Sequence, residues 1–158
     1  MKNLLKPALV FIITVGISLT GCDKEQLTQD GTIKYGTSFG MCIGFCQNEI
    51  TISQSNVNLV RRKNVSNESK TCSKGFSAEQ RQQLISKIDL PRFFILDERY
   101  GCPDCADGGA EWIEIEQDGK KHKITFEYHR EPDAVKAYIN DLRQQMTSFT
   151  DCKWLPDV

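Results

Sequence analysis

Short stretches in which apolar and polar residues alternate predict the strands of this chain. Such alternation is found in the segments 49–53, 57–59 and 111–116, and a period of two places one set of side chains on a buried face of a sheet. An Asp-Gly pair at 118–119 is typical of a two-residue hairpin turn, and apolar residues recur on one face of the return strand at 124–128. The pattern therefore predicts two β-hairpins, one in each half of the chain.

Apolar residues at helical spacing predict two helices. The first begins at Ser77, where Gln80 completes a capping box, and ends before Pro91. The second runs from about Pro132, a first-turn proline, to Met146. Each helix follows one of the hairpins, so the order suggests a repeated unit of loop, hairpin and helix.

The segments between these elements show no clear period. We expect a loop at 36–46, a polar loop at 64–74, and a strand or other extended segment at 92–96. Hairpins separated by single helices favour an α+β fold over a parallel sheet. The predicted architecture is a two-layer antiparallel sheet with two helices on one face.

The first 22 residues have the form of a bacterial lipoprotein signal. Two lysines precede an apolar run at 8–19, which ends in the lipobox Leu19-Thr20-Gly21-Cys22. The run is shorter than the roughly 20 residues that an uncleaved membrane-spanning helix needs. We therefore predict a cleaved signal peptide at 1–21 and a lipidated Cys22.

Lipidation of Cys22 determines the predicted organisation and location. Residues 22–31 then form a tether, and residues 32–158 form a single α+β domain. More than one acyl chain, such as palmitate, on this cysteine suffices for stable membrane anchoring. We expect the protein in the bacterial cell envelope, at the periplasmic face or the cell surface of the outer membrane.

Charge excludes one class of partner. The 20 Lys and Arg residues against 21 Asp and Glu give a formal net charge of −1, so we predict no nucleic-acid partner. The expected partners are the membrane, through the lipid on Cys22, and an envelope protein.

The cysteines predict a disulfide framework. Once Cys22 is assigned to lipid, six remain: Cys42, Cys46, Cys72, Cys102, Cys105 and Cys152. An even number in an oxidising compartment favours disulfides, although the spacing leaves the pairing open. Cys72 precedes one predicted helix and Cys152 follows the other, so these two would meet if the helices packed antiparallel.

Two other chemistries compete for the close cysteine pairs. Cys102-Pro103-Asp104-Cys105 is a CxxC motif, which can exchange disulfides when its first cysteine caps a helix. Gly108-Gly109 and a predicted strand follow it here, so a structural disulfide is favoured. A four-thiolate zinc site, formed with the cysteines at 42 and 46, is disfavoured by the oxidising location.

The remaining polar candidates predict no catalysis. Asp104 and Asp107, with Glu111 nearby, do not match a calcium loop, so we expect a solvated acidic turn. His122 lies two residues before Ile124 and therefore on the same face of the predicted strand. This predicts a partly packed ring and not a general base. No serine or cysteine has a recognisable nucleophile context, so we predict no catalytic residue, metal or cofactor.

The first cysteine loop carries a resemblance. With its Cys42-Ile43-Gly44-Phe45-Cys46 sequence, it resembles the opening loop of an uncharacterised family of bacterial envelope lipoproteins with a Cys-x-Gly-x-Cys-like motif. The resemblance covers most of the region 35–146 and implies a secreted α+β module. The second cluster, at 102–109, goes beyond the family pattern. Because the family has no assigned activity, the resemblance implies no catalytic or binding residue.

Three function classes remain, and a binding or interaction module is the first of them. The first cysteine loop contains Phe39, Met41, Ile43 and Phe45, for which no strand or helix partner is predicted. They are candidates for an exposed recognition surface, and the alternative is that they plug one end of the core. The other two classes are a thiol–disulfide redox protein that uses the CxxC motif and a structural envelope component.

Overall fold

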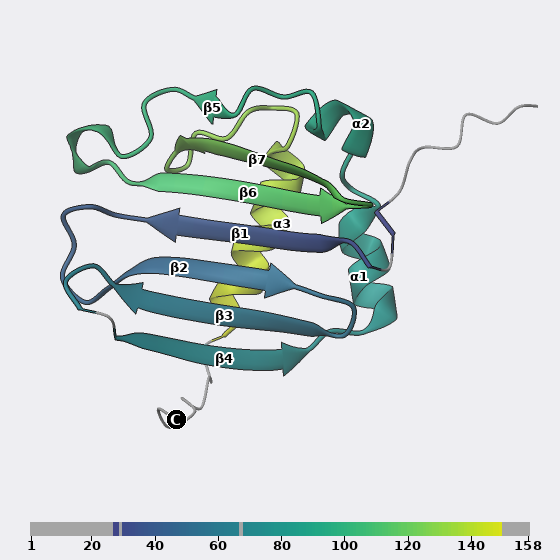
Figure 1. Cartoon of the computed structure of the whole chain (residues 1–158), viewed down its shortest axis with the longest axis horizontal. Coiled ribbons are helices and arrows are strands. Elements are labelled where there is room, and N and C mark those ends of the chain that lie inside the picture. The colour runs from purple at the N-terminus through teal and green to yellow at the C-terminus, as the bar shows by residue number, and fades with distance from the viewer. Residues whose placement is uncertain (1–26, 29, 67, 150–158) are drawn as a thin grey trace, which may run out of the picture.

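The computed structural model describes residues 27–28, 30–66 and 68–149. The lipobox, Cys22 and Cys152 lie outside the described residues. The chain forms an α+β fold in which one open, mostly antiparallel sheet is packed against helices (Figure 1). No helix in this part of the chain is long and apolar enough to cross a bilayer.

The sheet has seven strands in the order β4-β3-β2-β1-β6-β7-β5. Neighbouring strands are antiparallel except β5, which runs parallel to β7. The strands are β1 (Thr32–Ser38), β2 (Phe45–Ile52), β3 (Asn56–Lys63), β4 (Ser69–Gly75), β5 (Arg99–Tyr100), β6 (Ala110–Gln117) and β7 (Lys120–Glu127). The helices are α1 (Ala78–Ile85), α2 (Leu90–Phe93) and α3 (Lys136–Thr147), with a short 3-10 turn, η1 (Cys105–Asp107).

The core lies between one face of the sheet and the helices. Alternate residues of the central strands, such as Ile33 on β1 and Ile113 on β6, are fully buried. Leu84 of α1 and Ile139 of α3 belong to the same apolar cluster, and Figure 1 shows both helices behind the sheet. The predicted α+β fold, with an antiparallel sheet and helices on one face, is confirmed.

Both predicted hairpins and both predicted helices are confirmed as well. The hairpins are β2–β3 and β6–β7, and the helices are α1 and α3, although α3 begins at Lys136 and not near Pro132. The two halves are nevertheless unlike, because β4 lies between the first hairpin and its helix.

Three segments differ from the predictions. The segment 64–74 is not a loop, because most of it forms the edge strand β4, in which Cys72 is the one buried residue. Such a polar edge strand shows no hydrophobic alternation. The predicted loop at 36–46 is also too long, because β1 extends through Ser38 and β2 begins at Phe45.

The third difference is at 92–96, which was predicted to be extended. Residues Leu90–Phe93 form the short helix α2. The Asp89 carboxylate caps it by accepting from the Arg92 N–H at 3.1 Å, and Pro91 lies in the first turn. This capping chemistry favours a helical turn over a strand.

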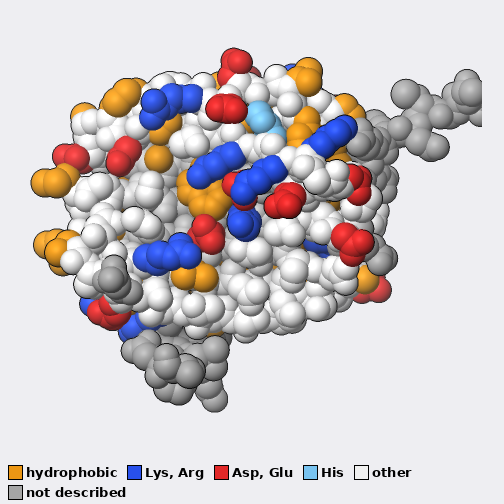
Figure 2. All heavy atoms as spheres, viewed as in Figure 1, with side chains coloured by type: hydrophobic (Ala, Val, Ile, Leu, Met, Phe, Trp, Pro, Cys, Tyr) orange, Lys and Arg blue, Asp and Glu red, His pale blue; other side chains and the backbone are white. Residues whose placement is uncertain are grey.

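The other face of the sheet is polar, as is usual for antiparallel sheets that face water on one side. Figure 2 views this face, on which charged side chains gather around a central apolar group. Lys34 and Lys121 both pair with Glu114, at 3.5 and 3.0 Å. The ammonium of Lys123 lies 4.2 Å from the ring centroid of Trp112.

Trp112 covers a glycine on the neighbouring strand. Gly36 of β1 is its direct cross-strand partner, and a Cβ atom added to Gly36 would lie 2.5 Å from Trp112 Cε2. Glycine at this position therefore allows the indole to pack on the backbone of the central strand.

Gly36→Ala is accordingly expected to lower the free energy of unfolding by about 1–3 kcal/mol, because the new methyl group forces Trp112 to move. Urea unfolding measures the change. The matched control is Gly75→Ala at the end of β4, where an added Cβ meets nothing within 4 Å and the expected change is within about 0.5 kcal/mol. Equal effects of the two substitutions would show that the contact with Trp112 is unimportant.

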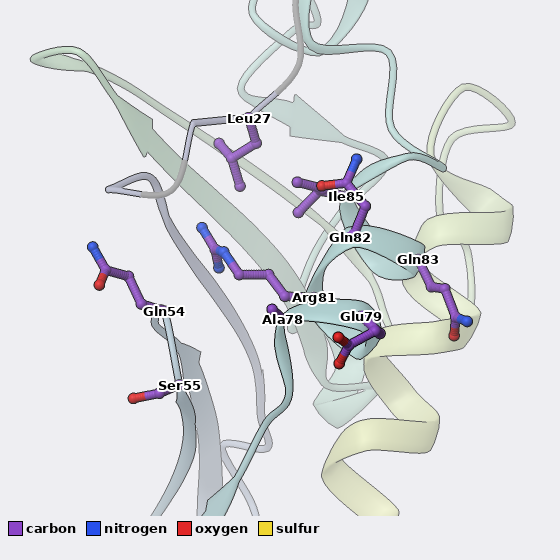
Figure 3. Close-up of a pocket in the computed structure, with 9 residues that line it drawn as sticks. All are labelled: Leu27, Gln54, Ser55, Ala78, Glu79, Arg81, Gln82, Gln83 and Ile85. Carbon is purple, nitrogen blue, oxygen red and sulfur yellow. The ribbon is translucent and has the colours of Figure 1, made fainter.

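The segment before β1 is attached to α1 by a buried arginine. The Arg81 guanidinium donates to the carbonyl oxygens of Ser53, Thr28 and Gly31, at 3.2, 3.1 and 2.7 Å. Leu27 is buried in the core. Leu27 and Arg81 both line a cavity of about 740 Å³, into which Arg81 points (Figure 3). The described residues of the predicted tether, 27–28 and 30–31, therefore pack against the domain.

Candidate functional site

The two close cysteine pairs lie at the same end of the sheet. Cys42 and Cys46 are at disulfide distance in the β1–β2 loop, with Cα atoms 5.6 Å apart. Cys102 and Cys105 are also at disulfide distance, with Cα atoms 5.5 Å apart, in the loop between β5 and β6. Cys72 is disulfide-bonded as well, but its predicted partner lies outside the described residues.

Hydrogen bonds join the loops at this end. The Gly40 N–H donates to Asp104 Oδ1 at 3.3 Å, which links the two cysteine loops. The side chain of Asn64, in the β3–β4 loop, donates to the carbonyl oxygens of Phe39 and Gly40 at 2.7 and 3.1 Å. We call residues 39–46, 64–66 and 101–109 together the cysteine-loop end. Its three loops form one connected surface.

The four candidate recognition residues of the first loop divide into two pairs. Phe39 packs edge-on against Tyr128, with ring centroids 4.8 Å apart, and Phe45 lies beneath Arg61, Lys63 and Lys70. Both phenylalanines are half-buried. By contrast, Ile43 is fully exposed and Met41 keeps 79% of its surface exposed.

A third exposed aliphatic side chain lies in the neighbouring loop. Val65 keeps 94% of its surface exposed, and Asn64 beside it holds the first cysteine loop. Hydrophobic side chains project from this end of the molecule in Figure 2. Met41, Ile43 and Val65 are therefore apolar tips on loops that hydrogen bonds and a close cysteine pair hold together.

The CxxC motif has no thioredoxin-like setting in the described structure. The Cys102 N–H donates to Glu127 Oε1 at 2.8 Å, and the motif leads into η1, a three-residue turn, and not into an α-helix. A thiolate at Cys102 would thus lack the helix N-terminus that lowers a thiol pKa in such enzymes. The zinc alternative requires four thiolates, whereas these sulfur atoms form two pairs.

The acidic candidates are not brought together. Asp104 and Asp107 are exposed in the second cysteine loop, whereas Glu111 is buried on the core face of β6. His122 is half-buried, as predicted, with Nε2 3.0 Å from the Leu96 carbonyl oxygen. His129 is exposed in the turn after β7.

A row of polar residues crosses four neighbouring strands on the core face. The strand register places Arg61 of β3 opposite Asn48 of β2. Asn48 lies opposite Thr37 of β1, and Thr37 lies opposite Glu111 of β6. Arg61 Nε donates to Asn48 Oδ1 at 2.7 Å, and Asn48 Nδ2 donates to Thr37 Oγ1 at 3.3 Å. We call these four residues the polar row.

Helix α3 supplies the cation for the acidic end of the polar row. Arg143 Nε donates to Glu111 Oε1 at 3.1 Å, and Nη2 lies 2.5 Å from a carboxylate oxygen of both Glu111 and Glu131. The hydrogen bond from Arg143 lowers the pKa of the Glu131 carboxyl below its ordinary value. The Glu111 side chain has no exposed surface, and a buried carboxylate is stable only when it is paired in this way.

Tyr35 lies beside the polar row on β1. Its side chain is fully buried, and its hydroxyl interacts with the side chains of Glu111 and Arg143. Burial, with a contribution from the nearby Glu111, raises the pKa of the Tyr35 hydroxyl far above its ordinary value. The group therefore keeps its proton and remains a hydrogen-bond donor.

The polar row and Tyr35 line a cavity of about 600 Å³. Its other polar lining residues include Arg143 and His129. The apolar lining residues are Phe39, Leu59, Tyr128, Met146 and Phe149. A cavity of this size, with an apolar wall and a few convergent polar groups, has the character of a small-molecule site.

Sequence reasoning did not identify Tyr35, Arg61 or Arg143. A signal for Glu111 was available, because it shares strand parity with Ile113 and therefore faces the core. A buried carboxylate needs a basic partner, but which of the chain's bases it would meet depends on the position of α3.

No model of a known protein family matches the chain, and no curated protein matches it. The resemblance to envelope lipoproteins in the first cysteine loop therefore stays a prediction. The features that bear on function are therefore the lipobox, the cysteine-loop end and the cavity beside the polar row.

Proposed function

We propose that the protein is a lipid-anchored bacterial envelope protein that binds a partner protein through its cysteine-loop end. The observation that carries the proposal is the exposure of Met41 and Ile43 on a loop that a disulfide closes. Exposed aliphatic side chains lose water favourably when a partner covers them. A loop held in one conformation by a disulfide also loses less entropy on binding.

The described residues before β1 and the apolar tips lie at opposite ends of the sheet. Residues 27–28 and 30–31 precede β1 at one end, and the β1–β2 loop follows it at the other (Figure 1). The seven residues of β1 separate the two ends by roughly 20 Å at about 3.3 Å per residue. A lipid on Cys22, shortly before Leu27, would place the tips away from the anchoring membrane.

This orientation favours a protein partner over the anchoring bilayer. Aromatic and long aliphatic residues such as Met are enriched in protein interfaces. The surface around the apolar tips carries charges of both signs, such as the ion pair of Lys63 with Glu68 and the exposed Asp104. An anionic lipid surface would instead favour a basic cluster.

Site-specific photo-crosslinking in living cells tests the proposal. A photoreactive residue at position 43 is expected to give a discrete crosslinked protein, and Ile43→Asp is expected to abolish the interaction by placing a charge at its centre. The control is Ile95, an isoleucine that is 82% exposed after α2, at which neither change should have an effect.

Three results would contradict the proposal. These are crosslinks to lipid alone, no crosslink at position 43, and equal crosslinking at positions 43 and 95. A loss of crosslinking in Ile43→Asp would not be due to unfolding, because substitutions of exposed side chains change the free energy of unfolding by about 0.5 kcal/mol or less.

A further inference from the structure

The cavity beside the polar row contains an arginine that makes no ion pair with a described residue. Arg61 lines the cavity and uses Nε for Asn48, and none of the described carboxylates lies within ion-pair distance of its guanidinium. An anion in the cavity would therefore be attracted to Arg61, and more strongly than in bulk water.

The rest of the wall is apolar. Phe39 presents an aromatic ring from the cysteine-loop end, and Tyr128 presents one from the turn after β7. Met146 and Phe149 close the cavity from the end of α3. Glu111 offers no further charge for a ligand, because Arg143 already neutralises it. The cavity thus combines an apolar surface with an arginine that has no ion-pair partner among the described residues.

We propose that this cavity binds a small amphipathic carboxylate, with Arg61 pairing with the carboxylate group. The aromatic and aliphatic wall holds an acyl or aryl body. The site is separate from the apolar tips Met41, Ile43 and Val65, so it neither requires nor excludes a protein partner at the cysteine-loop end.

Calorimetric titration of the full-length protein with octanoate, decanoate and phenylbutyrate tests the site. At least one of these probes is expected to bind saturably, and phenylbutanol, which lacks the carboxylate, is expected to bind at least about 10-fold more weakly than phenylbutyrate. Arg61→Gln should remove this preference. Arg62→Gln is the matched control, because Arg62 is exposed and pairs with Glu49 on the other face of the sheet.

Three outcomes would overturn the proposal. The first is that none of the three carboxylates binds saturably. The second is that phenylbutanol binds as tightly as phenylbutyrate. The third is that Arg62→Gln weakens binding as much as Arg61→Gln does.

Discussion

Replacing Arg143 with Met is expected to lower the free energy of unfolding by about 3–5 kcal/mol at neutral pH. The substitution keeps much of the side-chain volume but removes the cation that holds Glu111 and Glu131. Two carboxylates would then be buried without a partner, and breaking a buried ion pair by removing one member costs about this much. Urea unfolding of the wild type and the variant at pH 7 measures the difference.

The size of this effect should depend on pH. Arg143 lowers the pKa of Glu131 below its ordinary 4.5, so the wild type gains stability from this pair above that pH and loses it as the pH falls through the lowered pKa. In the variant, burial without a cation raises the pKa of Glu131, and protonation at acid pH relieves the penalty. The difference between the two proteins is therefore expected to be largest at neutral pH and to shrink below about pH 4.5.

An exposed ion pair provides the control. Arg130 pairs with Glu127 at 3.3 Å, and 78% of the arginine side chain is exposed. Arg130→Met should cost less than about 1 kcal/mol. A similarly small loss in Arg143→Met, or a loss that does not change with pH, would mean that the cluster is not the buried ion pair described here.

Replacing Arg81 with Met is expected to cost about 3–5 kcal/mol as well, for a different reason. Its guanidinium satisfies the carbonyl oxygens of Ser53, Thr28 and Gly31. Leaving a buried acceptor unpaired costs about 1–3 kcal/mol, so the three together cost at least about 3 kcal/mol. The variant should also release the segment before β1. Hydrogen exchange of the Gly31 amide, which donates to Thr28, is therefore expected to accelerate more than the amides of the central strands.

Two further variants define the role of Arg81. Arg81→Lys should recover only part of the stability, because a single ammonium cannot reproduce the planar fork of donors. Gln83→Met, at an exposed position of the same helix, should be nearly neutral. If Gly31 exchange in Arg81→Met stayed as slow as in the wild type, the proposed attachment of this segment would be wrong.

Local patterns predicted much of the fold. The hairpins β2–β3 and β6–β7 follow from alternation and an Asp-Gly turn, and α1 follows from its capping box, which the structure shows between Ser77 and Gln80. These signals act over a few residues, so they can be read without knowing what the segment packs against. The even number of cysteines similarly favoured disulfides before any partner was known.

Local sequence patterns did not predict the elements that are stabilised mainly by neighbouring strands. β4 is almost entirely polar and forms because β3 offers it a row of backbone hydrogen-bond partners. The central strand β1 alternates through Ile33 and Tyr35, but its Gly36 resembled a loop signal. That glycine is explained only by Trp112, which lies opposite it on a strand distant in sequence.

The sequence by itself thus determined the α+β class, the main hairpins and helices, and the cysteine-rich loop that carries Met41 and Ile43. Only the tertiary structure decided that both cysteine loops meet at one end of the sheet and that Tyr35 and Arg61 line one cavity. The physical reason is that strand register and the placement of α3 bring together residues far apart in the chain. Arg61, Thr37 and Glu111 become neighbours through backbone pairing across β3, β2, β1 and β6, which no local pattern records.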